Sequence, residues 1–142
     1  MKNRKILVPL DGSPLSSQTI RSLIALKENI PVPLSLLHVL DLSTISYQGF
    51  AEKTSEEIEE RARNKARNLL AEQQKLFTAA GMQVETILKE GDVRETICAV
   101  ADIGKFDLLV IGKHTDSELR NLLFDQISNY LVHHVKCPVL IV

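Results

Sequence analysis

The chain has 142 residues, of which 44% are hydrophobic and 25% charged, as is typical of a globular protein, so we expect residues 1–142 to form a single domain. A formal net charge of −1 and an aromatic content of 4%, without tryptophan, argue against a nucleic-acid partner, because phosphate backbones require a basic surplus and bases require stacking platforms. The first apolar stretch is too short for a signal peptide and no run approaches the length of a membrane span, so we expect a cytoplasmic protein without a membrane partner.

The first half of the chain alternates apolar runs with amphipathic segments. Residues 5–10 and 34–40 are short and continuously apolar, as in strands that are buried on both faces of a parallel sheet. Between them, Ser13 and Pro14 are typical of the cap and the first position of a helix. We expect this helix to extend to about Glu28.

A second helix is expected after a mixed loop at residues 41–53. Thr54 and Glu57 have the spacing of a capping box, in which a hydroxyl group and a carboxylate bind the free backbone N–H groups of a helix start. Gly81 suits the left-handed conformation that ends many helices. The charged stretch 56–67 indicates a solvated helix face with i,i+4 ion pairs, and recognition of a partner is the alternative.

The second half of the chain continues the alternation. Residues 84–88 and 106–111 are the next apolar runs, and Asp92 is expected to cap the helix between them. A last amphipathic helix stops before Pro138, and the chain ends with the apolar run 139–142. Strict alternation of strand and helix predicts an α/β fold, with a parallel sheet, right-handed crossovers and helices on both faces.

The residues that follow each strand are the candidates for a binding site, because ligands of such sheets lie beside the carboxyl ends of the strands. Asp11 follows the first strand, where its carboxylate could accept hydrogen bonds from a ligand or could only hold the turn; the spacing leaves both interpretations open. His114 follows the fourth strand and is the histidine expected nearest to a ligand. His133 and His134 are neighbours that suit a helix C-terminus.

The sequence lacks the motifs that are typical of several kinds of functional site. The chain has no G-x-G-x-x-G, Walker A or G-x-S-x-G pattern, which argues against a dinucleotide fingerprint, a P-loop and a hydrolase nucleophile. No spacing of histidine or cysteine predicts a metal site. Cys98 and Cys137 are interpreted as reduced, half-buried thiols, and a redox role is the alternative. We therefore expect neither catalytic residues nor a metal.

Five segments carry a resemblance to a known family. They are KILVPLDGS at 5–13, LHV at 37–39, GD at 91–92, FDLLVIGKH at 106–114 and CPVLIV at 137–142. Their order and spacing are similar to those of universal stress proteins over essentially the whole chain. The resemblance implies a three-layer α/β/α structure, the adenine nucleotide alpha hydrolase-like fold, with a five-stranded parallel sheet in the order 3-2-1-4-5.

The resemblance also implies a homodimer that forms through the last strands of two subunits. The residues of that strand are Val139, Leu140, Ile141 and Val142. A dimer would cover an apolar edge strand, which is otherwise an aggregation hazard.

Many members of the family bind ATP or AMP between strands one and four, and the resemblance brings a glycine pattern with it. In ATP-binding members, strand four is followed by a pattern of three glycines. Two residues separate the first glycine from the second, nine residues separate the second from the third, and Ser or Thr comes directly after the third. Gly112 matches the first glycine, but Thr115, Asp125 and Gln126 replace the later residues. Ser128 still matches a polar position. Since Thr115 adds bulk and Asp125 adds negative charge beside the phosphates, weak or absent ATP binding is expected.

The wall expected to contact adenosine is better preserved. By resemblance the binding residues would be Pro9, Leu10, Asp11, Val39, Gly112, His114, Thr115, Ile127 and Ser128. The sequence favours a regulatory protein with an unidentified protein partner; a sensor that still binds ATP or AMP is the alternative. A slow ATPase that uses Asp11 or His114 is a third hypothesis. A receiver-like domain is disfavoured, because Glu90 stands where an aspartate is needed.

Overall fold

The computed structural model describes residues 4–30, 33–47, 54–113 and 126–142. The elements, in chain order, are β1 (Ile6–Pro9), α1 (Pro14–Ala25), η1 (Lys27–Asn29), β2 (Leu34–Leu40), η2 (Leu42–Thr44), α2 (Ser55–Ala79), β3 (Val84–Glu90), α3 (Val93–Ile103), β4 (Leu108–Ile111), α4 (Gln126–His134) and β5 (Val139–Ile141). The five strands are parallel and form one sheet in the order β3-β2-β1-β4-β5. The expected fold class and strand order are confirmed.

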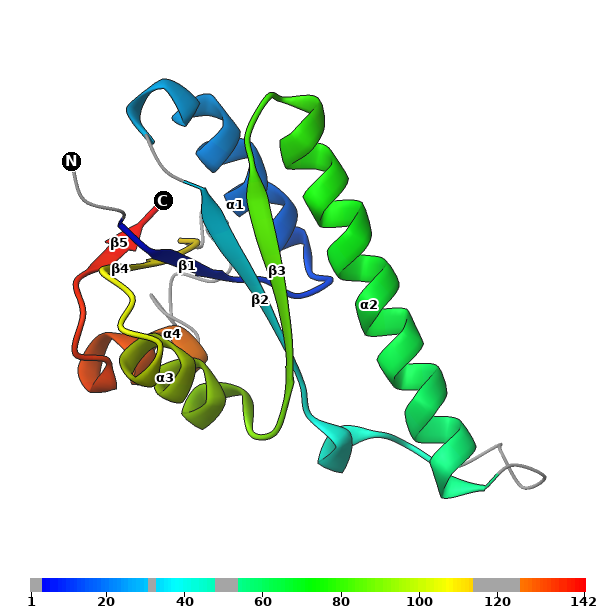
Figure 1. Cartoon of the computed structure of the whole chain (residues 1–142). Helices are drawn as coiled ribbons and strands as arrows, with labels where there is room; N and C mark the ends of the chain where they lie inside the picture. The colour runs from blue at the N-terminus through cyan, green and yellow to red at the C-terminus, as the bar shows by residue number, and fades with distance from the viewer. Residues whose placement is uncertain (1–3, 31–32, 48–53, 114–125) are drawn as a thin grey trace.

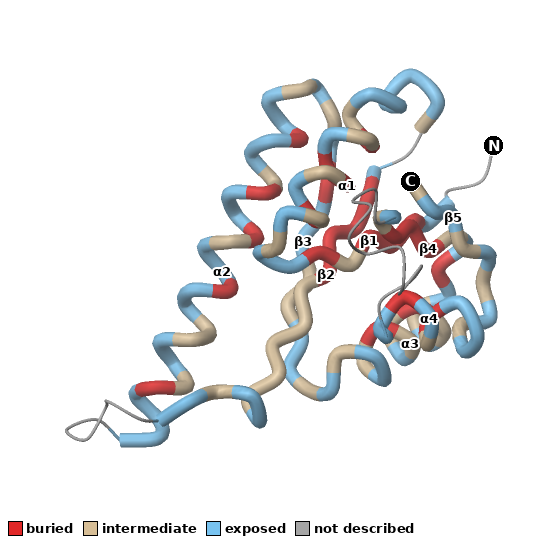
Figure 2. The backbone as a smooth tube through the Cα atoms, turned by 180° about the vertical axis from the view of Figure 1, so that it is seen from behind, coloured by how far each residue is buried: buried red, intermediate tan, exposed pale blue. Residues whose placement is uncertain are grey.

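Helices cover both faces of the sheet, so the molecule has three layers (Figure 1). Ile6 and Val8 of β1 pack into the cluster beneath α1 and α2, whereas Leu7 packs into the cluster beneath α3 and α4. Successive strand residues point to opposite faces, which explains why the central strands are apolar without interruption. Figure 2 shows the buried backbone concentrated in β1, β4 and the start of β2. Within the described ranges, no helix is long and apolar enough to cross a membrane.

The predicted starts of the first three α-helices are confirmed, and the start expected for the last helix lies outside the described residues. Ser13, Thr54 and Asp92 each accept a hydrogen bond from the backbone N–H three residues later, at 3.4, 3.1 and 3.0 Å. These bonds bind N–H groups that have no partner within the helix. Gly81 has a φ of +83°, which is the left-handed conformation predicted for the end of α2.

Three boundaries differ from the expected ones. α1 ends at Ala25, and a 3-10 turn at Lys27–Asn29 replaces its last turn. β3 continues to Glu90, because its final residues still pair with β2. β4 begins at Leu108 rather than at Phe106, whose backbone N–H instead binds the carbonyl of Ala101 at the end of α3.

The charged face of α2 does more than contact solvent. Arg63 lies 3.7 Å from Glu59, an ion pair of the expected i,i+4 type, but its nearest carboxylate is Glu90 of β3 at 2.8 Å. The hydrogen bond from Arg63 lowers the pKa of Glu90 below its ordinary value. This contact joins the middle of α2 to the end of the edge strand.

Phe77 anchors α2 to the sheet, since its side chain is fully buried in the cluster on that face. We predict that Phe77→Ala lowers the free energy of unfolding by about 3–5 kcal/mol, because the substitution removes buried contacts and leaves a cavity. The neighbouring Leu76 is 54% exposed, and Leu76→Ala serves as the control, with a change below about 1 kcal/mol. Urea denaturation measures both; similar losses in the two variants would contradict the observed packing.

Candidate functional site

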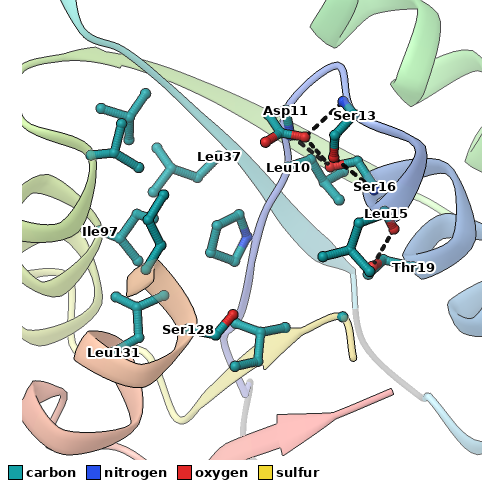
Figure 3. A pocket seen from close by; sticks show the side chains of 16 residues that line it. Leu10, Asp11, Ser13, Leu15, Ser16, Thr19, Leu37, Ile97, Ser128 and Leu131 are labelled. Carbon is teal, nitrogen blue, oxygen red and sulfur yellow. Dashed lines mark hydrogen bonds between the residues drawn. The ribbon is translucent and has the colours of Figure 1, made fainter. Parts of the chain in front are cut away.

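A cleft of about 160 Å³ opens at the carboxyl ends of β1 and β4, between α1 and the α3–α4 layer (Figure 3). Residues from all five of these elements, together with residues of β2, line it. They are Pro9, Leu10, Asp11, Ser13, Leu15, Ser16, Thr19, Leu37, Val39, Val93, Ile97, Ile111, Gly112, Ile127, Ser128 and Leu131. The cleft is smaller than the roughly 300 Å³ at which pockets for drug-sized ligands begin, so it suits a fragment the size of one ring system.

Seven of the nine residues predicted to bind a ligand lie on this cleft. They are Pro9, Leu10, Asp11, Val39, Gly112, Ile127 and Ser128. His114 and Thr115 lie outside the described residues. The structure therefore brings together the predicted residues of β1, β2, β4 and α4, and their roles toward a ligand stay predictions.

Asp11 is held in a fixed position by the start of α1. Its Oδ1 accepts hydrogen bonds from the Ser13 backbone N–H and the Ser16 hydroxyl group, both at 2.8 Å. The same hydroxyl accepts a bond of 2.8 Å from the Asp11 backbone N–H. Figure 3 shows the second carboxylate oxygen directed away from these serines. Of the two interpretations of Asp11, the turn-holding role is therefore present, and the second carboxylate oxygen has no hydrogen-bond partner within the described part of the chain.

The protonation of Asp11 follows from these contacts. Partial burial raises the pKa of the carboxyl group, but hydrogen bonds from Ser13 and Ser16 outweigh it, and His38 adds a smaller attraction, so that the pKa lies below its ordinary value of 3.8. The group is thus a carboxylate at neutral pH. A base with a lowered pKa is poorly matched to proton abstraction near pH 7, whereas it accepts hydrogen bonds well.

Two further side chains, one from α2 and one from β2, hold the turn in place. The Nε2 of Gln73, on α2, donates a bond of 2.8 Å to the Asp11 carbonyl, and the His38 Nδ1 lies 3.0 Å from the Leu10 carbonyl. Because a carbonyl only accepts, this nitrogen of His38 carries the hydrogen. Gln73 is buried, and its Oε1 has no partner among the described residues. The sequence pattern did not single out Gln73, since a glutamine on a charged helix is normally exposed.

Gly112 is required by packing at the floor of the cleft. A Cβ atom at this position would collide with Thr19 Oγ1, and it would lie 3.2 Å from Leu15 Cδ1. The Thr19 hydroxyl group is held in place by a 2.9 Å bond to the Leu15 carbonyl. The family resemblance explains this glycine by the approach of phosphates, but the contact with α1 demands it without any ligand.

The apolar wall opposite Asp11 was missed by sequence reasoning. Val93 and Ile97 of α3 and Leu131 of α4 line it, and Ile97 and Leu131 are almost completely buried. Their helical spacing indicated only an inward face. A core position and a cleft position give the same apolar signal, so the pattern could not distinguish them.

Within the described ranges, the two thiols and the neighbouring imidazoles of His133 and His134 lie outside the cleft lining. Cys98 and Cys137 are free and half-buried, as expected, and burial, together with the carboxylate of Asp102, raises the pKa of both thiols. A raised pKa disfavours the reactive thiolate. The Nδ1 atoms of His133 and His134 lie 2.8 and 2.7 Å from carbonyls of the preceding helical turn, which agrees with a role at the end of α4.

Comparison with known proteins identifies the family of this architecture. The model of the universal stress protein family matches residues 2–142. The chain belongs to the universal stress protein family. Universal stress protein MJ0531 of Methanocaldococcus jannaschii is 26% identical over 140 residues, which cover 98% of this chain and 81% of the relative.

Solved structures of universal stress proteins share the fold. The structure of MJ0577, also from Methanocaldococcus jannaschii, superposes with a TM-score of 0.79 at 25% identity, covering 100% of this chain and 96% of that one. A universal stress protein family protein from Arabidopsis thaliana, with AMP bound, gives a TM-score of 0.71 at 20% identity over 98% of this chain and 90% of that one. At such identity the second likeness shows the fold alone.

The bonds to Asp11 lead to a prediction about its titration. We expect Ser16→Ala to raise the pKa of Asp11, because the variant removes one of the hydrogen bonds that favour the charged form. Stability that depends on this lowered pKa is present above the ordinary value of 3.8 and is lost as the pH falls through the folded-state pKa. The variant should therefore lose less stability on acidification than the parent protein.

Carbon-13 NMR of the Asp11 carboxyl group measures this pKa directly. Ser17→Ala is the matched control, since Ser17 is an exposed serine of the same helix and should leave the titration unchanged. An Asp11 pKa that is the same in Ser16→Ala and in the parent protein would contradict the contribution of the Ser16 bond.

Proposed function

We propose that this universal stress protein is a cytoplasmic regulatory protein that binds ATP weakly or not at all and acts through a protein partner. The observation that carries the proposal is the combination of Asp125 and Gln126 where ATP-binding members have glycine and a hydroxyl residue. The proposal treats residues 1–142 as one functional domain.

The chemistry of the phosphate side supports weak ATP binding. Gln126 is the first residue of α4 and is exposed, at the end of a helix where backbone N–H groups would face phosphates. Its side-chain amide can donate a hydrogen bond, but the side chain is longer than that of serine. Asp125 comes directly before Gln126, at a position where the family pattern has a glycine. A carboxylate there would repel a triphosphate, and it would compete with the phosphates for the backbone N–H groups at a helix start.

The cleft supports binding rather than catalysis. Its lining is mainly apolar, and Asp11 is the carboxylate among the described lining residues. Pro9, Leu10 and Val39 would flank a flat ring, and the free oxygen of Asp11 would accept a hydrogen bond from an amino group or a ribose hydroxyl. A slow ATPase is less well supported, because the lowered pKa makes Asp11 a poor general base.

An adenine-nucleotide sensor is the second candidate function. The Arabidopsis relative with AMP bound shares the fold, and AMP carries a single phosphate. A nucleotide with less phosphate charge would lose less binding free energy through repulsion by Asp125 than ATP would. We therefore expect AMP, if either nucleotide binds, to bind this chain more tightly than ATP.

Calorimetric titration with ATP and Mg²⁺, and separately with AMP, tests the proposal. We predict no measurable heat with ATP for the parent protein, and at least tenfold tighter ATP binding for the Asp125→Gly, Gln126→Ser double variant, because it restores the family pattern. The affinity for AMP should differ much less between the parent protein and the double variant. Glu56→Gln is the control, since it also removes a carboxylate near a helix start, on a helix that contributes no residue to the described cleft lining. Tight ATP binding by the parent protein would contradict the proposal and favour the sensor.

We also propose a homodimer that forms through β5. β5 is the last strand of the sheet, and it pairs with β4 along one edge. Leu140 and Ile141 are 42% and 38% exposed, which is unusual for large apolar side chains on a short edge strand. Pairing with β5 of a second copy would bind the free backbone groups and cover this apolar surface.

Charge insertion on β5 is predicted to give a monomer. Leu140→Lys would place an ammonium group in the proposed interface, and burying it without a partner would cost several kcal/mol. Sedimentation equilibrium should show a dimer for the parent protein and a monomer for the variant. Val132→Lys is the control, because Val132 is similarly exposed, at 40%, on α4. A parent protein that sediments only as a monomer, or a dimer that persists in Leu140→Lys, would exclude this interface.

A further inference from the structure

A second cavity borders a different face of α3 from the cleft. It is a groove of about 700 Å³ between α3 and the strands β2 and β3, and Gly104 and Phe106 also line it. Apart from its contact with α4, α3 packs mainly against β2, and Figure 1 shows β3 at the edge of the sheet with α2 over its other face. The α3-side face of β3 is therefore left open. A volume of this size lies within the range of small-molecule sites.

The groove is built from two regular faces. On β3, the alternate residues Glu85, Ile87 and Lys89 point into it, as expected for a period of two. On α3, positions 96, 99, 100 and 103 lie along one side of the helix and also line it. Ile103 is 82% exposed. An isoleucine that is exposed at the lip of an apolar groove gains from any ligand that covers it.

Ser35 supplies a polar group on the floor of this groove. Its side chain is about nine-tenths buried, with 9% exposure, and it lines the groove from β2 beside Glu85 in the strand register. Among the described residues no hydrogen bond involves its hydroxyl group, and this oxygen is not one of the fully buried polar atoms that lack a partner, so it retains contact with the open groove. The group is thus available to a ligand atom.

The charges around the groove are balanced. Lys5 and Lys89 are the cations on its rim, and Glu85 and Glu95 are the anions. Lys5 is already engaged, since its ammonium group binds the Gly104 carbonyl and lies 4.6 Å from the centre of the Phe106 ring. The rim carries equal numbers of positive and negative charges and offers an ion no net attraction to offset the cost of its desolvation, so the groove favours an uncharged occupant.

We propose that the groove binds an uncharged amphiphile with a single aliphatic chain, whose body lies between α3 and β3 and whose oxygen hydrogen-bonds to Ser35. The apolar lining of Ile87, Val100 and Ile103 would hold the chain. This site is separate from the nucleotide cleft and does not depend on the function proposed for that cleft.

Three probes of equal chain length test the proposal: 1-octanol, octanoate and octylammonium. In proton–nitrogen NMR spectra of the full chain, 1-octanol should cause saturable shifts at the backbone amides of Ile87, Lys89, Ala99 and Ile103. The two ions should bind at least about fivefold more weakly. Ser35→Ala should weaken 1-octanol binding about fivefold, the effect of losing one hydrogen bond.

Filling the groove provides the matched pair of variants. Ala99 is exposed on the groove side of α3, so Ala99→Trp should block the groove without disturbing the core and abolish the shifts. Ala71→Trp makes the same change at an exposed alanine of α2, on the other face of the sheet, and should leave binding unchanged.

Three results would overturn the proposal. One is the absence of saturable shifts with 1-octanol, or shifts that persist in Ala99→Trp. Another is binding of octanoate or octylammonium as tight as that of 1-octanol. The third is a set of groove amide shifts that depend on protein concentration without any probe and vanish in Ala99→Trp, because a second copy of the chain would then occupy the groove.

Discussion

The position of Asp11 depends on one hydroxyl group. Ser16 accepts a hydrogen bond from the backbone N–H of Asp11 and donates one to its carboxylate, so a single side chain of α1 fixes both the backbone and the charge at the end of β1. Gln73 then holds the carbonyl of the same residue from α2. The turn is thereby tied to two helices on one face of the sheet, and the cleft beside the turn has a rigid rim. Such preorganisation reduces the entropy that a bound ligand must lose.

Much of this arrangement could be predicted, because local chemistry determined it. The cap at Ser13 depends on residues close in sequence, and so does the left-handed end at Gly81. Both are confirmed. The strand order came from the family resemblance, and the alternation of strands and helices was consistent with it. Asp11 was singled out as a candidate because parallel strands place their carboxyl ends at one edge.

The parts that could not be predicted depend on contacts between distant segments. Gln73 is buried because α2 passes over the Asp11 turn, which no local pattern records. Arg63 pairs most closely with Glu90 across elements rather than along its own helix. The openness of the groove beside Ser35 depends on where α3 lies over the sheet, and helical periodicity gives the inward face of a helix but not its lateral position.

α3 connects the two cavities. Ile97 faces the cleft and Val100 faces the groove, three residues further along the same 11-residue helix. Two adjacent faces of this helix therefore border open volume as well as packed side chains. If filling one cavity moves α3, the affinity of the other must change, and thermodynamic linkage makes the effect equal in both directions.

Charge would explain how the two halves of the proposed nucleotide site could be separated. In that proposal the adenosine side would depend on apolar contact and on one oxygen of Asp11, neither of which requires the phosphate residues. The phosphate side would depend on backbone N–H groups and on the absence of negative charge. A carboxylate at position 125 would then oppose each added phosphate in turn, so that the penalty would grow from AMP to ATP. A protein with this pair of features would respond to the nucleoside part of a ligand and discriminate against the triphosphate.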